Sequence, residues 1–368
     1  MIIRSKAPLR LGLAGGGSDV SPYCDIYGGC VLNATIDLYA YCTLRPTNNN
    51  EILIYSIDRD EKYVTKSQDK LPIDDHLDLH KGVYNRIIKE FNLNPLSFEL
   101  YTYSDAPAGS GLGSSSTVVV AILQAFVEWL NLPLGDYDIA QLAYDIERID
   151  IGLSGGKQDQ YAATFGGFNF MEFYDKERVI VNPLKIKEKY IFELEASILL
   201  FNSGVSRSSA IIIDDQKNIL NSHQEQRLQA MHQIKENSFI IKEALLKGDF
   251  GKLYLTMKNA WEAKKGTSDM VSNNNLESIY ELAMKSGAYC GKISGAGGGG
   301  FMMLFVDPMK RMNVINALSN SKGYFVNFHF VNNGCTSWKV NEHELISSKV
   351  DPVQNKEKIQ NHQTYYIF

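Results

Sequence analysis

Pro107-Ala-Gly-Ser-Gly-Leu-Gly-Ser-Ser-Ser116 is the stretch of sequence around which the chain is organised. It follows a β-like run at 97–103 and leads into an apolar segment that predicts a helix over about 115–130. The three glycines free backbone N–H groups to face a ligand, and the N-terminus of the following helix adds unpaired donors and partial positive charge. The stretch predicts either a polyphosphate-binding loop or a Gly-rich turn that only caps a buried helix.

Two familiar nucleotide motifs do not fit the glycine-rich stretches. A Walker A loop requires Lys before its Ser or Thr, whereas Gly113 is followed directly by Ser114. The run from Gly295 to Gly300 satisfies G-x-G-x-x-G, but a dinucleotide site needs a helix next, and 301–306 is β-like. We therefore reject a Rossmann site and predict a hairpin whose backbone presses against a ligand or against another glycine loop.

Composition favours a small-molecule substrate. The 368 residues suffice for two domains, and 37 basic against 42 acidic residues give a net charge of −5, which argues against nucleic acid or an anionic membrane as the main partner. The five cysteines contain no Cys-x-x-Cys pair, and no apolar run reaches the ~18 residues of a membrane span. We expect a cytoplasmic protein, monomeric or homodimeric, with reduced thiols.

The first glycine loop carries three ionisable residues, Lys6, Arg10 and Asp19. Leucines alternate with Arg10, Gly12 and Ala14, which predicts a half-buried strand with Arg10 on the face opposite the leucines. The charged residues either surround one glycine loop at a binding site or are solvated charges on an edge strand.

Two carboxylates stand out further along the chain. Glu147 falls on the alanine-rich stripe of a helix predicted over about 137–151, which indicates close packing around its side chain. A buried carboxylate needs a cation, either at a functional site or in a structural salt bridge. Asp159 lies in a glycine-flanked segment and begins a short helical pattern. It either caps that helix or accepts the proton of a substrate hydroxyl and orients that hydroxyl.

The composition of the chain changes at the start of its second half. A charged stretch at 185–195 marks the predicted domain boundary, and the loop at 203–209 either holds a phosphate through Ser206 and Arg207 or caps a helix. Strands and helices alternate in the last third in the order expected of a split βαβ sandwich.

Together, the stretches 6–19, 107–116 and 292–300 resemble motifs one, two and three of the GHMP small-molecule kinases, and the resemblance covers about residues 1–340. Within that superfamily, the segments 7–19 and 156–161 look most like the branch that holds D-glycero-D-manno-heptose 7-phosphate kinases and fucokinase domains. The resemblance implies an α+β fold. Its parts are an N-terminal domain over 1–188 similar to ribosomal protein S5 domain 2, a ferredoxin-like domain over 189–350, and a tail over 351–368, with ATP and sugar between the domains.

The resemblance also implies roles for individual residues. Asp159 and Arg10 take the catalytic positions together with Lys6, and Mg²⁺ is bound by Ser115 and Glu147. Lys6, Lys157 and Arg207 are candidates for the substrate's own phosphate. The implied ATP-binding residues are Pro107, Ala108, Gly109, Ser110, Gly111, Leu112, Gly113, Ser114, Ser115 and Ser116. The implied substrate-binding residues are Gly16, Gly17, Ser18, Asp19, Asp159, Ser206, Arg207, Gly297 and Gly298.

The implied reaction is ATP-dependent phosphorylation of the anomeric hydroxyl of D-glycero-D-manno-heptose 7-phosphate to the 1,7-bisphosphate, in nucleotide-activated heptose synthesis for surface polysaccharide. Galactokinases have an acidic residue and a histidine where this chain has Gly16 and Gly17. The resemblance therefore implies room for a larger or phosphorylated sugar. The alternatives are a kinase for another sugar, L-fucose-like or galactose-like, and a non-catalytic sensor that binds ATP and sugar.

Overall fold

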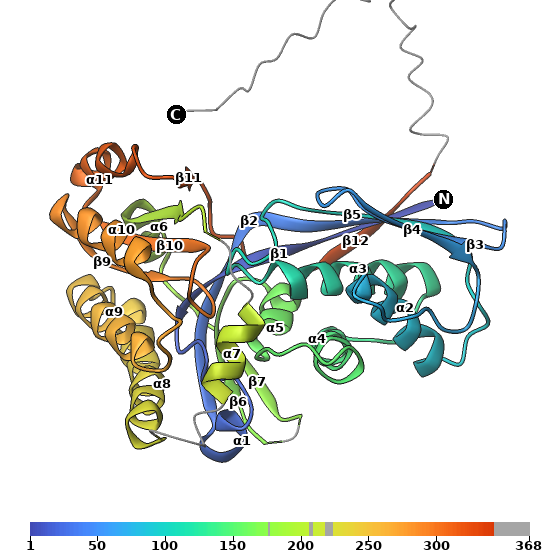
Figure 1. Cartoon of the computed structure of the whole chain (residues 1–368), viewed down its shortest axis with the longest axis horizontal. Helices are drawn as coiled ribbons and strands as arrows, with labels where there is room; N and C mark the ends of the chain where they lie inside the picture. Colours follow the sequence, from blue (N-terminus) through green and yellow to red (C-terminus); the bar gives the residue numbers. More distant parts are fainter. Residues whose placement is uncertain (176, 206–208, 218–223, 342–368) are drawn as a thin grey trace, which may run out of the picture.

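The computed structural model describes residues 1–175, 177–205, 209–217 and 224–341, and arranges them around two separate β-sheets with helices packed on each (Figure 1). This arrangement confirms the predicted α+β class. Ser206, Arg207 and the tail predicted at 351–368 lie outside the described residues.

The first sheet has eight strands, in the order β12-β1-β2-β5-β3-β4, with β6 paired to β2 and β7 paired to β6. Its strand pairs are antiparallel apart from the parallel pair of β3 with β5. The strands are β1 (Ile2–Ala14), β2 (Gly29–Pro46), β3 (Glu51–Ser56), β4 (Glu61–Lys66), β5 (Phe98–Ser104), β6 (Phe168–Phe173), β7 (Val179–Pro183) and β12 (Thr336–Val340).

The helices of the first half pack on one face of this sheet (Figure 1). Central among them is α3, which contacts β1, β2, α2, α4 and α5 because its apolar residues surround it almost completely. It begins within one residue of the predicted start. The helices are α1 (Tyr23–Tyr27), α2 (Asp78–Glu90), α3 (Ser114–Leu130), α4 (Asp136–Asp145) and α5 (Gln158–Phe165).

The second sheet is antiparallel, in the order β11-β8-β10-β9, which is the split βαβ order expected for the last third of the chain. Its strands are β8 (Ile198–Asn202), β9 (Ala288–Ile293), β10 (Phe301–Val306) and β11 (Tyr324–Val326). Its helices are α6 (Glu188–Ser197), α7 (Ser209–Lys217), α8 (Gln224–Lys247), α9 (Phe250–Lys265), α10 (Asn274–Lys285) and α11 (Arg311–Leu318), with a 3₁₀ turn at Pro308–Lys310.

Burial of β1 differs from the prediction of a half-buried strand. Leu9, Leu11 and Leu13 pack in a core shared with the second half of the chain, including Leu200 and Met303. The opposite face, which carries Arg10 as predicted, is covered by the glycine loops. Both faces of the second half of β1 are therefore buried, because the strand lies between the two halves of the molecule.

Two further features differ from the sequence prediction. The helix predicted over 137–151 is α4 followed by a π turn at Ile146–Asp150, a form that is frequent at functional sites. Near residue 340 the chain returns to the first sheet, because β12 pairs with β1. The predicted second domain, 189–350, thus includes a strand of the first sheet, and the boundary near residue 188 stays a prediction.

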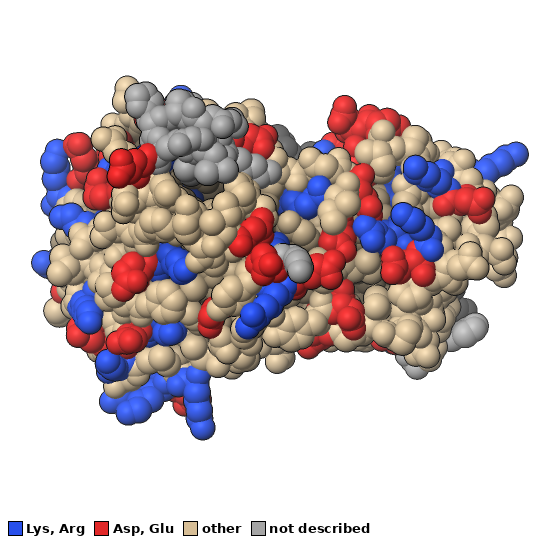
Figure 2. Space-filling model, turned by 90° about the horizontal axis from the view of Figure 1, so that it is seen from below, with Lys and Arg blue, Asp and Glu red and all other residues tan. Residues whose placement is uncertain are grey.

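Surface charge agrees with the mild net charge. Figure 2 shows acidic and basic side chains interspersed over one face of the molecule. Among the helices of the described residues, none combines the length and the apolar character needed to cross a bilayer.

Candidate active site

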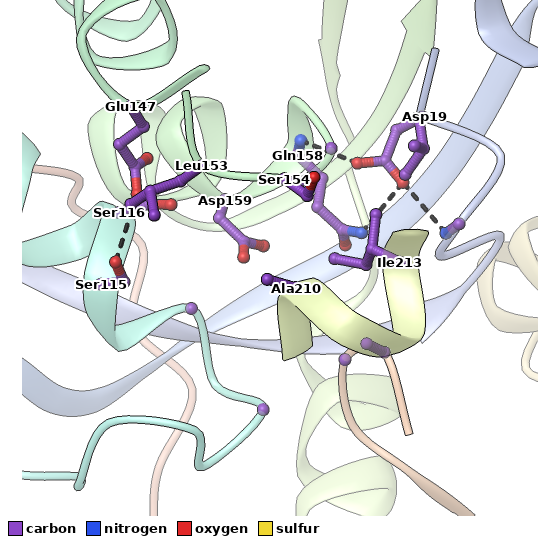
Figure 3. A pocket seen from close by; sticks show the side chains of 18 of the residues that line it. Asp19, Ser115, Ser116, Glu147, Leu153, Ser154, Gln158, Asp159, Ala210 and Ile213 are labelled. Carbon is purple, nitrogen blue, oxygen red and sulfur yellow. Dashed lines mark hydrogen bonds between the residues drawn. The ribbon is translucent and has the colours of Figure 1, made fainter. Parts of the chain in front are cut away.

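The three glycine stretches meet at one cleft of about 470 Å³ (Figure 3). The loop after β1 contributes Gly17 and Asp19, the loop before α3 contributes most of 108–116, and the hairpin between β9 and β10 contributes Gly295 and Ala296. Further walls come from residues 153–156 and 158–159, from helix α7, from Glu147 and Arg148, and from Lys264 of α9. Segments far apart in the sequence thus form a single site.

The hairpin between β9 and β10 presses against the loop before α3. Gly111 has φ +78°, and a Cβ there would lie 2.2 Å from the carbonyl oxygen of Ser294. A Cβ on Gly300 would likewise lie 2.3 Å from the carbonyl oxygen of Ser110. The Phe301 N–H donates to that carbonyl over 2.9 Å. Of the two predicted roles for the hairpin, contact with another glycine loop is confirmed.

Arg10 connects these segments. Its Nε and one terminal nitrogen donate to Oδ1 of Asp159 over 2.7 and 2.6 Å, and its other terminal nitrogen donates to the Gly111 carbonyl and, over 3.4 Å, to the Ser294 hydroxyl. The residue is 3 % exposed, so these bonds replace the water that a buried guanidinium would otherwise need. The interpretation of Arg10 as a solvated surface charge is wrong.

Asp159 lies in the first turn of α5, whose N-cap is Lys157, and makes no capping hydrogen bond. Arg10 occupies Oδ1, whereas Oδ2 has no hydrogen-bond partner among the residues that the structure describes. A quarter of the side chain is exposed, and Figure 3 shows it at the centre of the cleft. One oxygen is therefore fixed and the other is available to a ligand.

Asp19 forms the wall on one side of Asp159 (Figure 3). Its carboxylate accepts hydrogen bonds from the Gly17 N–H over 3.0 Å and from the backbone and side-chain N–H groups of Gln158, each over 3.1 Å. It rests against Gly156, where a Cβ would lie 2.0 Å from Oδ2. These contacts hold a buried carboxylate at one orientation.

Ser115 and Glu147 lie together on the other side of Asp159 (Figure 3). The Ser115 hydroxyl donates to Oε1 of Glu147 over 3.2 Å, and Gln160 donates to Oε2. Arg148 is 3.8 Å from Oε2, so the salt-bridge interpretation has a partner as well. The π turn carries Glu147 and Arg148 on consecutive positions toward the same cleft.

This oxygen pair suits Mg²⁺. A buried carboxylate and a serine hydroxyl are hard oxygen donors, and they stand at the start of α3 beside the glycine loop where phosphates would lie. No cluster of three or more His, Cys, Asp or Glu side chains that could hold a metal occurs within the described part of the chain. An ion here would depend on phosphate oxygens and water for its remaining ligands, as Mg²⁺ usually does in nucleotide sites.

Several predicted site residues do not line the cleft. Lys6 is four residues from Arg10 on β1, about 13 Å away at strand spacing, and its ammonium lies 4.3 Å from the ring centre of Tyr39. Gly297 and Gly298 contact Val271 instead. Lys157 is buried with its ammonium over the Tyr144 ring. The remaining predicted residues outside the lining are Gly16, Ser18, Pro107 and Leu112.

The structure also adds residues that the sequence did not suggest. Gln158 holds Asp19, Arg148 stands beside Glu147, and Lys264 of α9 reaches the cleft from the second half of the chain. The Lys264 ammonium donates to the Gly16 carbonyl over 3.0 Å, and a Cβ on Gly17 would lie 2.8 Å from it. The space left by Gly17 is therefore filled by an ammonium group, whereas the resemblance implied room there for a larger or phosphorylated sugar.

Burial affects two lysines near this loop. It lowers the pKa of Lys264 to about 8, although the Asp19 carboxylate acts in the opposite direction. Burial also lowers the pKa of Lys292 to about 7, helped by the charges of Lys264 and Arg10. Lys292 donates to the Gly12 carbonyl over 2.7 Å, and as a lone charge in the β-like run 289–293 it was a usable signal in the sequence.

Comparison with known proteins assigns the family. The GHMP kinase N-terminal domain matches residues 78–167 and the GHMP kinase C-terminal domain matches 241–324. A D-glycero-alpha-D-manno-heptose 7-phosphate kinase of Campylobacter jejuni is 53% identical over 92% of this chain and 99% of its own length. The chain belongs to the GHMP kinase family. The family confirms both the two-domain fold and kinase activity, and it makes ATP the phosphoryl donor.

Two solved GHMP kinase relatives have the same fold over nearly their whole length. A D-glycero-D-manno-heptose 1-phosphate kinase from Bacteroides thetaiotaomicron has a TM-score of 0.78 at 50% identity, covering 92% of this chain and 99% of its own. A putative sugar kinase from Campylobacter jejuni has a TM-score of 0.77 at 52% identity, covering 92% and 98%.

Proposed function

We propose that this GHMP kinase transfers the γ-phosphoryl group of ATP to the anomeric hydroxyl of D-glycero-D-manno-heptose 7-phosphate, giving the 1,7-bisphosphate for nucleotide-activated heptose synthesis. The observation that carries the proposal is Asp159, whose Oδ1 is fixed by Arg10 while Oδ2 faces the cleft. Such a carboxylate is placed to accept a hydroxyl proton. The 53% identity to a heptose 7-phosphate kinase supports this acceptor over L-fucose-like or galactose-like sugars and over a non-catalytic sensor.

The protein contributes mainly position and charge to such a reaction. As the bond forms between the anomeric oxygen and the γ-phosphorus, the bond from that phosphorus to the β–γ bridging oxygen breaks and ADP leaves. Asp159 takes the hydroxyl proton at Oδ2, and Arg10 holds the carboxylate in place and stabilises nearby negative charge. Asp19, fixed by Gln158, binds sugar hydroxyls beside it.

The nucleotide phosphates belong on the opposite side of Asp159. Residues 109–111 and 113–116 line the cleft there, and α3 begins at Ser114 without a side-chain cap, so its first N–H groups and its partial positive charge face an anion. Ser115 and Glu147 would hold Mg²⁺, which when bound neutralises phosphate charge. Arg148 adds a fixed positive charge on this side.

We also propose that the enzyme acts in the cytoplasm. All five cysteines are unbridged, which suits a reducing compartment. Its state as a monomer or homodimer remains a prediction.

Substrate choice is tested by ADP release with the purified full-length protein, ATP and Mg²⁺. The acceptors are heptose 7-phosphate, heptose 1-phosphate, free heptose and L-fucose. We expect the highest kcat/KM with the 7-phosphate and a product phosphorylated at both C1 and C7. A higher kcat/KM with the 1-phosphate or with L-fucose would replace the proposed acceptor, and no ADP release with any of them would favour the sensor.

The role of Asp159 is tested by Asp159→Asn. We expect kcat to fall about 100-fold or more, the scale of a positioned acid–base group. The ATP dissociation constant should stay within about twofold, because the glycine-rich stretch 107–116 is unchanged. Asp136→Asn is the matched control, since Asp136 is exposed on α4 outside the cleft. Near-normal kcat in Asp159→Asn would remove this residue from the chemistry.

The role of Glu147 is tested by Glu147→Gln with a Mg²⁺ titration of the rate. We expect half-maximal activity to need about tenfold more Mg²⁺, because an anionic ligand is lost. Glu128→Gln serves as control, since Glu128 lies on α3 and pairs with Lys339 away from the cleft. An unchanged Mg²⁺ requirement with a lower melting temperature would identify Glu147 as a structural salt-bridge partner of Arg148.

A further inference from the structure

The proposed substrate carries its own phosphate, so a phosphate-binding cation should face the sugar side of the cleft. This inference rests on the proposed function. Within the described residues, the positively charged side chains that line the cleft are Arg10, Arg148 and Lys264. A phosphate dianion taken out of water needs at least one of them as a partner.

Two of these cations are already engaged. The Arg10 guanidinium is occupied by Asp159, Gly111 and Ser294. Arg148 stands beside Glu147 and donates to the Leu153 carbonyl over 3.4 Å, on the side of Ser115. When the anomeric hydroxyl of the sugar contacts Asp159, neither arginine is positioned to bind a phosphate at the opposite end of the sugar.

Lys264 has the properties of an anion partner. The residue is 7 % exposed, and its ammonium has three donors, of which one reaches the Gly16 carbonyl. No carboxylate in the described part of the chain lies within ion-pair distance of it, and the nearby Asp19 carboxylate is already held by Gly17 and Gln158. A buried ammonium with spare donors at the wall of a cleft is stabilised when an anion binds.

Its location matches the geometry of the reaction. Glu147, Ser115 and Ser116 lie on one side of Asp159 and Asp19 and Gln158 on the other (Figure 3). Lys264 lies near Asp19, because its ammonium donates to the Gly16 carbonyl and fills the space where a side chain of Gly17 would lie. A sugar that presents its anomeric oxygen to Asp159 and its hydroxyls to Asp19 extends toward Lys264, away from the nucleotide.

We propose that Lys264 binds the phosphate group of the sugar phosphate and thereby makes the enzyme select a phosphorylated acceptor over the free sugar. Gly17 is part of this subsite, because any side chain there would displace the ammonium. Lys292 is not, because it lies outside the cleft lining and donates to the Gly12 and Leu13 carbonyls.

The test is Lys264→Gln, whose amide can keep the hydrogen bond to Gly16 without the charge. Loss of a charge-assisted hydrogen bond should raise KM for heptose 7-phosphate roughly 10- to 100-fold. KM for ATP and kcat/KM for free heptose should stay within about twofold. The matched control is Lys265→Gln, one residue along α9, where the lysine pairs with Glu262 and Glu277 outside the cleft.

A Lys264→Gln enzyme that keeps the wild-type preference for the 7-phosphate over free heptose would overturn the proposal. A uniform loss of activity on both acceptors would overturn it as well, because it would indicate a structural role. The proposed function is tested with the wild-type enzyme instead. If the wild-type enzyme does not phosphorylate heptose 7-phosphate, both the proposed function and the proposed role of Lys264 are wrong.

A second measurement needs no variant. The charged groups that act on Lys264 are Asp19 and Lys292, and Lys292, with a pKa of about 7, is already largely neutral above pH 7.5. Because the pKa of Lys264 is about 8, its positive charge is present below that pH and is lost above it. The ratio of KM for heptose 7-phosphate to KM for free heptose should therefore rise between pH 8 and pH 9.5, approaching tenfold per pH unit. A constant ratio across that range would contradict the proposal.

Discussion

The hydrogen bonds of the buried Arg10 guanidinium are the constraint on which the site depends. A cation without water must have its donors satisfied inside the protein. Here the acceptors come from Asp159, Gly111 and Ser294, which are 149, 101 and 284 residues away in the sequence. Burying one side chain of β1 thus requires the loop before α3, the β9–β10 hairpin and α5 to come together. Glycines permit that approach because a Cβ would collide with carbonyl oxygens.

The cleft built in this way has two chemically different sides. Hydroxyl and carboxylate oxygens of Ser115 and Glu147 stand together beside the start of α3, on the side that we propose for the ATP phosphates and Mg²⁺. The carboxylate of Asp19 and the ammonium of Lys264 stand on the other side, which we propose for the sugar phosphate. Asp159 lies between them, so the same carboxylate can meet the acceptor hydroxyl and face the phosphoryl group.

Much of this arrangement could be predicted from local sequence. Asp19 and Asp159 lie beside glycines, and Arg10 alternates with leucines on a strand, so their special positions show in the chain itself. Lys264 could not be found that way, because it belongs to a polar run of an amphipathic helix and only the packing of α9 against the first glycine loop gives it a role. The position of Lys6 depends on packing in a similar way: it shares a strand with Arg10, but its ammonium lies over the ring of Tyr39 and outside the cleft lining. The π turn that carries Arg148 to the cleft could not be predicted from the sequence either, because the position of Glu147 is compatible with an ordinary α-helix.

The most direct measurement is a double-mutant cycle between Arg10 and Asp159, read as the single-turnover rate of phosphoryl transfer at saturating ATP and sugar phosphate. If Arg10 acts through the carboxylate that it fixes, Arg10→Gln and Asp159→Asn should each slow the step strongly, and the double variant should be little slower than the worse single variant. If the rate of the double variant falls by the product of the two single-variant factors, the account is contradicted, because the two residues would then act independently.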